Sequence, residues 1–169
     1  MPVSGATVLV IWWGGAAGAT ESHTKCVHAE ITTTDAAGRY KIEGWFGLWY
    51  GKYLMLSDAN AAHIAYKLGY RSLMNIDQSK ADIPLEPFTG TKDEWFHEMR
   101  NGLVACFGPP DEAQSKLAEF YNAIAADMES FAETVEQRQV AKNLRNRAKL
   151  NLPGWHPGGD SNTPPTRGN

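Results

Sequence analysis

The chain has 169 residues, of which 43% are hydrophobic, and a formal net charge of −3 at pH 7. That length is enough for one domain with a hydrophobic core, or for one small domain with an appendage. Six tryptophans argue against a disordered chain, and the acidic balance argues against a nucleic-acid partner. No apolar run approaches the ~20 residues of a transmembrane helix. The apolar run at 9–13 is too short for the core of a signal peptide, so none is expected in the given chain.

The N-terminal part is rich in β-branched and aromatic residues and predicts strands at 7–13 and 26–34. The four residues Asp35-Ala36-Ala37-Gly38 then predict a turn. Asp35 can hydrogen-bond its own backbone, and Gly38 can take a positive φ without a Cβ clash. Residues 39–42 are again β-rich, so the pattern predicts a β-hairpin across this turn.

An aromatic stretch punctuated by glycine follows the turn. One interpretation is a loop whose rings cap the open end of the sheet. The other is a recognition surface, because amphipathic rings anchor many interfaces. The residues of this candidate binding surface are Trp45, Phe46, Trp49, Tyr50 and Tyr53. Further strands are expected at 62–67 and 70–76, and residues 77–88 are expected to be a connection.

At Thr91 the hydrophobic period changes from that of strands to that of helices. Thr91 and Glu94 form a capping-box pattern at the start of a first helix. An apolar stripe from Leu117 to Phe131, at spacings of three and four residues, predicts a second helix. A second capping-box pattern, Thr134 with Gln137, favours a break before a third helix, and one continuous helix is the alternative.

The charges of the helical part separate along the sequence, since residues 111–136 are mostly acidic and residues 138–149 are basic. A basic helix can indicate an anionic partner. We favour a simpler interpretation, because cations stabilise a helix C-terminus and solvated helix faces are charged in general. Residues 151–169 are dense in Pro, Gly, Ser, Thr and Asn and are expected to form a disordered or loosely draped tail.

No constellation of catalytic type and no cofactor or metal motif is visible. No two of the five histidines stand four residues apart, and neither cysteine belongs to a Cys-x-x-Cys pair. Alternation in a strand would place Cys26 and His28 on one face about 6–7 Å apart, too far for a direct hydrogen bond. We therefore expect no enzymatic activity, no metal and no cofactor. A hydrolase that uses His28 or His63 is the alternative.

The two cysteines, Cys26 and Cys106, leave two interpretations open. In a cytosolic protein they would be buried thiols, whereas in an exported protein an even count suggests a bridge. Such a bridge would close a loop of about 80 residues and would contribute roughly 4–5 kcal/mol in the chain-entropy model.

Residues 2–8 (PVSGATV) followed by residues 34–42 (TDAAGRYKI) form one recognisable pattern, and residues 65–70 (AYKLGY) form a second. Together they resemble the carboxypeptidase regulatory-like domain. That family has a transthyretin-like, prealbumin-type β-sandwich and serves as a non-catalytic accessory in many bacterial proteins. The resemblance covers about residues 2 to 76. The family's first strand, of the type G-x-V-x-D, has no counterpart here, so an exposed edge strand could pair with a second copy.

More narrowly, residues 26–30 (CVHAE) and Trp45 resemble a group of small exported proteobacterial proteins. These carry the sandwich followed by a helical part that contains a second cysteine. The resemblance implies a disulfide between Cys26 and Cys106, and a periplasmic or lipoprotein localisation.

The sequence therefore predicts an α+β protein with a transthyretin-like antiparallel β-sandwich at 1–88 and a helical appendage of two or three helices packed on it at 89–150. The predicted core consists of Val8, Val10, Ile31, Tyr40, Ile42 and Ile64 in the sheet and of Trp95, Leu117 and Ile124 in the helices. The predicted function is a non-enzymatic, protein-binding module of the bacterial envelope, for example an immunity-type inhibitor of a secreted toxin. A carbohydrate-binding accessory module is the alternative, since Trp and Tyr faces stack on sugars.

Overall fold

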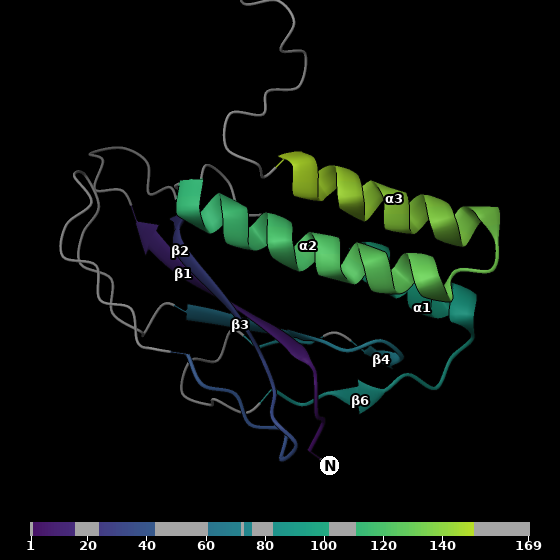
Figure 1. The fold of residues 1–169 in the computed structure, drawn as a ribbon, viewed down its shortest axis with the longest axis horizontal. Coiled ribbons are helices and arrows are strands. Elements are labelled where there is room, and N and C mark those ends of the chain that lie inside the picture. The colour runs from purple at the N-terminus through teal and green to yellow at the C-terminus, as the bar shows by residue number, and fades with distance from the viewer. Residues whose placement is uncertain are drawn as a thin grey trace, which may run out of the picture.

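The computed structural model describes residues 2–15, 24–42, 61–71, 73–75, 83–101 and 111–150 of the chain. The strands are β1 (Thr7–Gly15), β2 (Thr24–Thr33), β3 (Ala61–Tyr66), β4 (Tyr70–Arg71), β5 (Leu73–Asn75) and β6 (Glu86–Pro87), and the helices are α1 (Lys92–Asn101), α2 (Asp111–Phe131) and α3 (Val135–Leu150). The strands precede the helices along the chain, which gives an α+β arrangement (Figure 1). The predicted tail at 151–169 lies outside the described residues.

The larger sheet is antiparallel and has the strand order β2-β1-β3-β5. Its central strand, β1, pairs with β2 from Thr7↔Thr33 to Gly15↔Thr24, and with β3 from Thr7↔Tyr66 to Trp12↔Ala61. The sequence of β1 is apolar along most of its length, as is typical of a strand covered on both faces. The strands predicted at 7–13, 26–34 and 62–67 are thereby confirmed, with bounds that differ by one or two residues.

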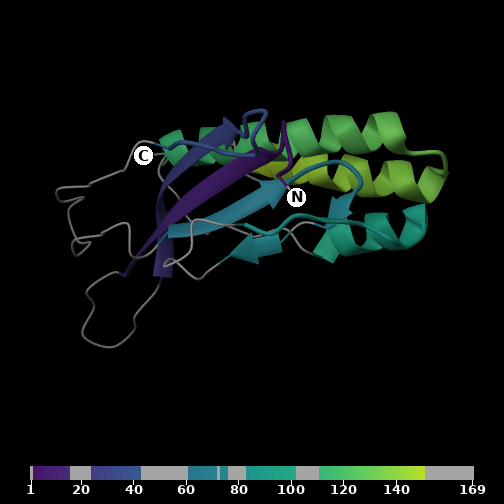
Figure 2. The ribbon, with the colours of Figure 1, turned by 90° about the horizontal axis from the view of Figure 1, so that it is seen from below.

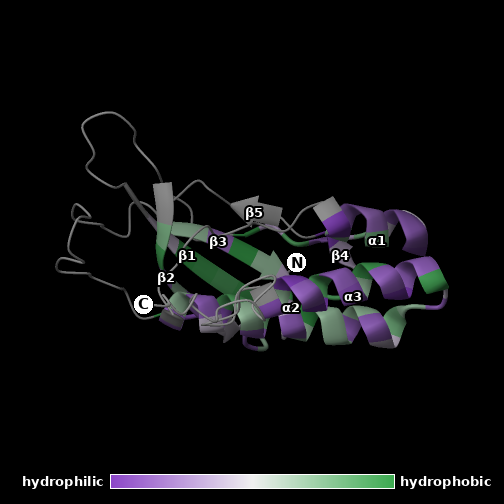
Figure 3. Ribbon diagram, turned by 90° about the horizontal axis from the view of Figure 1, so that it is seen from above, coloured by the Kyte–Doolittle hydropathy of each residue, from purple (hydrophilic) through white to green (hydrophobic). Residues whose placement is uncertain are grey.

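Helices cover one face of this sheet, as Figures 1 and 2 show from two directions. On this helix-covered face, side chains of the sheet and of α1 and α2 form one buried cluster that includes Leu9, Ile11, Ile64, Trp95, Leu117 and Ile124. Figure 3 shows the hydrophobic strands beside helices whose exposed sides are hydrophilic. The predicted core residues of the helices are therefore buried as expected.

The opposite face of the sheet, which we call the far face, has a second buried cluster: Val8, Val10, Trp12, Val27, Ala61 and Ala65. The side chains of Tyr40, Ile42, Ile83 and Leu85 pack against it and are partly buried. The predicted core residues Tyr40 and Ile42, and also Ile31, are thus half-buried rather than fully buried. Two covered faces explain why β1 can be apolar at nearly every position.

The turn at Asp35-Ala36-Ala37-Gly38 is confirmed. The Asp35 carboxylate accepts hydrogen bonds from the backbone N–H groups of Ala37 and Arg39, both at 2.8 Å, and Gly38 has φ +69°. The second arm of the predicted hairpin is wrong, because residues 39–42 form no strand. After Arg39 the chain leaves the edge strand β2 and places Tyr40 and Ile42 on the far face. Burial of these two side chains replaces continued pairing with β2.

The single strand predicted at 70–76 is also wrong. Residues 70–71 form β4, which pairs with β6 in a separate two-stranded sheet, whereas residues 73–75 form β5, which pairs with β3. The indole N–H of Trp95 donates a 2.9 Å hydrogen bond to the carbonyl of Tyr70 and ties β4 to α1. The expected connection at 77–88 contains β6. Among the described residues no second sheet faces the larger one, so the sandwich stays a prediction.

Both capping boxes are confirmed. The Glu94 carboxylate accepts from the backbone N–H of Thr91 at 2.7 Å, and the Thr91 hydroxyl accepts from the N–H of Glu94 at 3.3 Å. At the second box, the Gln137 side-chain oxygen accepts from the N–H groups of Glu133 at 2.7 Å and Thr134 at 3.3 Å. The break between α2 and α3 is therefore real, and one continuous helix is excluded.

Gln137 also connects the helices to one another. Its side chain is 4% exposed, and its amide N–H donates a 2.6 Å hydrogen bond to the Asp93 carboxylate in α1. The ammonium of Lys92, also in α1, donates to the carbonyl of Phe131 at 3.2 Å and lies over the Phe131 ring. The first turn of α1 is thus fixed to the end of α2 and the start of α3.

Candidate functional site

Two segments, residues 40–42 and residues 83–85, lie over the far face outside any strand, and their side chains alternate as those of strands do. In residues 40–42, Tyr40 and Ile42 pack inward while Lys41 is exposed. In residues 83–86, Ile83 and Leu85 pack inward while Pro84 and Glu86 are exposed. A period of two is the signature of an extended chain with one buried side.

A groove of about 1210 Å³ lies along these two segments. Val8 and Ala65 of the sheet contribute to its floor, and both are buried. Among the described residues that line it, the charged ones are Arg39, Lys41 and Glu86, so this part of the rim is slightly basic on a chain whose net charge is −3. The groove has an apolar floor and a charged rim and is the candidate site of the far face.

One polar pair crosses the groove. The Tyr40 hydroxyl and the His63 Nδ1 are 2.9 Å apart and share a hydrogen bond, and their ring centroids are 6.1 Å apart. His63 lies on β3 opposite Val10 of β1. This contact holds the 39–42 segment to the sheet, because Tyr40 reaches down from the segment to the strand.

His28 is a buried structural histidine rather than an exposed one. It is 7% exposed, its Nε2 is 3.1 Å from the Glu30 carboxylate, and its ring centroid is 5.1 Å from that of Trp12. The Glu30 carboxylate in turn lies 3.8 Å from the Lys116 ammonium of α2. A ring enclosed in this way is poorly placed to contact a substrate, and the network instead connects the edge strand to the helices.

Cys26 and His28 do not share a face, contrary to the expectation from alternation. The register of β1 and β2 shifts between Trp12 and Trp13, so that Trp12 pairs with His28 and Trp13 with Cys26. Val27 is the extra residue of this β-bulge. Cys26 consequently lies in the helix-covered cluster, whereas His28 packs against Trp12 of the far face. A cysteine–histidine catalytic pair at these positions is thereby excluded.

The remaining predicted site residues lie outside the described residues. They are Cys106 and the aromatic residues Trp45, Phe46, Trp49, Tyr50 and Tyr53. Cys26 is 1% exposed, and no described cysteine is a free thiol. The pairing of Cys26 with Cys106 stays a prediction.

Ile83 and Leu85 are site residues that the sequence analysis assigned to a connection. Their signal is the alternation Ile-Pro-Leu-Glu-Pro at 83–87, in which every second residue from Ile83 to Leu85 is apolar. The two prolines concealed it, because proline is depleted in strands and usually marks an edge or a loop.

Tyr66 is an unusual buried group on the helix-covered face. It is 2% exposed, and its hydroxyl makes no hydrogen bond. Burial, and secondarily the nearby Asp127 carboxylate, raise the pKa of this phenol well above its usual value. Tyr66 packs within the buried cluster of the helix-covered face.

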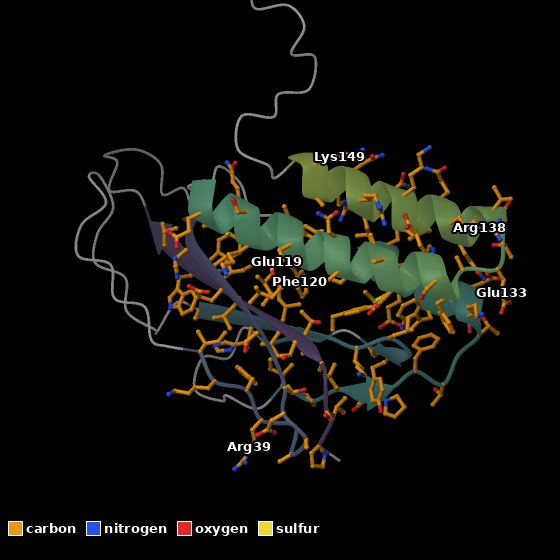
Figure 4. All side chains as sticks on the ribbon, viewed as in Figure 1. Arg39, Glu119, Phe120, Glu133, Arg138 and Lys149 are labelled. Atoms are coloured by element: carbon orange, nitrogen blue, oxygen red, sulfur yellow. The ribbon has the colours of Figure 1, made fainter. Side chains whose placement is uncertain are left out.

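One basic residue of α3 pairs with a carboxylate of α2, and another contacts the connection between the two helices. The Arg145 guanidinium is 2.6 Å from the Glu129 carboxylate, and Arg138 donates to the carbonyl of Glu133 at 3.1 Å. Figure 4 shows Arg138 and Glu133 close to the connection between the two helices. The contacts between α2 and α3 support the simpler interpretation of the basic segment, in which its charges face solvent and the acidic neighbour helix.

Neither a metal site nor a membrane segment is found in the described part of the chain. No group of three or more His, Cys, Asp or Glu residues there could hold a metal ion. No helix of the described residues combines the length and the apolar character needed to span a bilayer.

The three segments that make up the two patterns behind the family resemblance lie together in space. The backbone N–H of Gly5 donates to the Thr34 carbonyl at 3.0 Å, the Thr34 hydroxyl donates to the Val3 carbonyl at 2.7 Å, and the Lys67 ammonium donates to the Gly5 carbonyl at 3.1 Å. These contacts give the motif residues a common structural role in fixing the start of β1. Comparison with protein-family models, curated proteins and solved structures finds no match to this chain.

Proposed function

We propose that this chain is a non-enzymatic binding module of the bacterial envelope, that its partner is a protein, and that it binds through the far face. One observation carries the proposal. Ile42 is the last described residue before the aromatic segment 43–60 and packs against the far-face cluster, and Ala61, the first described residue after it, belongs to that cluster. The segment with the predicted binding residues therefore starts and ends at the far-face cluster.

Such an arrangement suits recognition of a protein. Aromatic side chains supply most of the binding energy of many interfaces, and they act best at the centre of a patch that excludes water. The apolar floor of the groove on the far face would provide that patch. An immunity-type inhibitor of a secreted toxin is one concrete form of such a module.

The envelope setting is proposed together with a Cys26–Cys106 disulfide. Cys26 is buried at the sheet edge below the helices, so a bridge from this position would join the strand region to the helical region. Bridges of this kind persist in oxidising compartments such as the periplasm.

Binding to immobilised chain tests the proposal. The wild-type chain would be exposed to envelope extract of the source bacterium, beside a Trp49→Ala/Tyr50→Ala variant and a Val135→Ala control on α3, where Val135 is 71% exposed. We expect one protein to be retained in stoichiometric amount by the wild type and the control. The aromatic variant should bind it at least ~30-fold more weakly, as the loss of an interface hot spot of about 2 kcal/mol implies.

Two outcomes would count against the proposal. Equal retention by the aromatic variant would show that the far face is not the binding surface. A glycan array that binds the wild type and loses binding with the same variant would instead assign a carbohydrate ligand.

A further inference from the structure

The two extended segments of the far face, residues 40–42 and residues 83–85, have the side-chain pattern of strands but belong to no strand in the structure. Lys41 and Glu86 point outward, whereas Ile42 and Leu85 pack inward on the sheet. Both segments line the same groove. The two segments thus cover part of the far face and form two sides of the groove.

The size of the groove favours an occupant larger than a typical small molecule. Its volume of about 1210 Å³ exceeds the ~300–1,000 Å³ that is common for small-molecule pockets. Its floor is apolar at Val8 and Ala65, as an inward-facing row of side chains from an extended peptide would require.

We infer that the groove receives an extended segment of the partner protein, which adds as a β-strand beside Lys41 and Ile42. The inference rests on the proposed protein-binding function and specifies its binding mode. The added strand lies along the 39–42 wall rather than the 83–86 wall, because Pro84 has no N–H to donate to a neighbouring strand. Ile83 and Leu85 then contact the occupant through side chains.

The rim of the groove sets the expected sequence of the occupant. Arg39 and Lys41 outnumber Glu86 among the described charged residues of the lining. Arg39 is partly neutralised by Asp35 at 3.3 Å, which leaves Lys41 as the main cation of this wall. The segment should therefore alternate apolar residues, which face the floor, with solvent-facing residues that include Asp or Glu near Lys41.

Selection from a random eight-residue peptide library, displayed on phage, tests this mode with the whole chain as target. We expect selected peptides that alternate apolar residues and carry an acidic residue. Binding of a selected synthetic peptide should fall at least tenfold with Lys41→Glu and stay within twofold with Lys142→Glu. Lys142 is an exposed lysine of α3, and Figure 4 shows this helix on the opposite side of the molecule from Arg39. No selected peptides, basic peptides, or equal effects of the two variants would overturn the inference.

Amide hydrogen exchange provides a second test that does not depend on a variant. The backbone amides of Lys41 and Ile42 should exchange rapidly in the free chain and at least tenfold more slowly with the peptide bound. Slow exchange in the free monomer would mean that this wall is already paired, and the inference would be wrong. A free chain that sediments as a dimer and becomes monomeric with Lys41→Glu would make a second copy the occupant, which also overturns it.

The two proposals fail separately. If the Trp49→Ala/Tyr50→Ala variant loses the envelope partner while Lys41→Glu retains it, the groove mode is wrong and the binding function stands. If neither variant loses the partner, the groove mode and binding through the far face are both wrong.

Discussion

The substitution Gln137→Ala tests how the three helices are held together. The side chain is 4% exposed and makes three hydrogen bonds: it accepts from the N–H groups of Glu133 and Thr134 and donates to the Asp93 carboxylate at 2.6 Å. Loss of the cap costs about 1 kcal/mol. Loss of a partly buried hydrogen bond to a charged carboxylate costs about 1.5–3 kcal/mol.

We therefore expect Gln137→Ala to lower the free energy of unfolding by about 2–4 kcal/mol, a large fraction of the ~5–15 kcal/mol typical of a domain. Equilibrium unfolding in urea, followed by tryptophan fluorescence, measures this change. The matched control is Gln139→Ala, which removes only an exposed 2.9 Å hydrogen bond to Asn143 and should change stability by less than about 0.5 kcal/mol. A loss for Gln137→Ala no greater than that of the control would refute the reasoning.

Gln137→Glu separates the two roles of this side chain. The variant keeps oxygen acceptors for the N–H groups of the cap but sets a second carboxylate against Asp93. Like charges at this distance raise the pKa of the pair, so we expect a destabilised variant at pH 7 that recovers relative to wild type as the pH falls. A variant whose deficit is independent of pH would show that the Asp93 contact contributes little.

Four further predictions follow from individual residues. A thiol titration of the unreduced chain in denaturant should find no free thiols in a monomer. Two free thiols would exclude the Cys26–Cys106 disulfide and would remove the main support for the envelope setting. Gly38→Ala should lower the free energy of unfolding in urea more than Gly69→Ala does. Both glycines have positive φ, but only at Gly38 would a Cβ meet atoms of Pro2 and Val3, both at 2.8 Å. Equal losses of stability in the two variants would show that the clash relaxes. The backbone N–H of Arg39 holds the pKa of Asp35 below its usual 3.8, so ionised Asp35 stabilises the fold above that pH, and this contribution is lost as the pH falls through the lower folded-state pKa. The urea midpoint of Asp35→Asn should therefore drop less between pH 5 and pH 2 than the midpoint of wild type. Equal drops of the two midpoints would contradict this prediction. Tyr66→Phe should leave stability unchanged or raise it by up to about 1 kcal/mol, since it removes a buried hydroxyl without a partner, and a loss above 1 kcal/mol would mean that the hydroxyl is satisfied in solution.

Features that depend on neighbours in the sequence could be predicted from it. The turn at Asp35–Gly38 and the capping boxes at Thr91 and Thr134 each close through hydrogen bonds between residues four or fewer positions apart. The residue types present at those positions are sufficient to make the bonds, whatever packs nearby. For the same reason the break between α2 and α3 was predictable.

The candidate site was only partly predictable. Val8 and the strand that holds it follow from the apolar pattern, and Tyr40 follows from its place after the turn. The groove itself depends on Ile83 and Leu85, which meet Tyr40 and Ile42 over the sheet after some forty intervening residues. A pattern within one segment contains no information on which other segment lies beside it.

The sequence by itself determined where strands give way to helices, where the chain turns, and which residues of β1, α1 and α2 form the core, because hydrophobic period and capping are local. Tertiary structure decided that residues 39–42 cross the far face, that residues 70–75 divide between two sheets, and that a bulge at Val27 separates Cys26 from His28. Each of these outcomes depends on competition for burial and backbone pairing between segments distant in the chain. The packing and hydrogen-bond energies that decide between such arrangements arise only when the segments are in contact, so they cannot be read from one segment of the sequence.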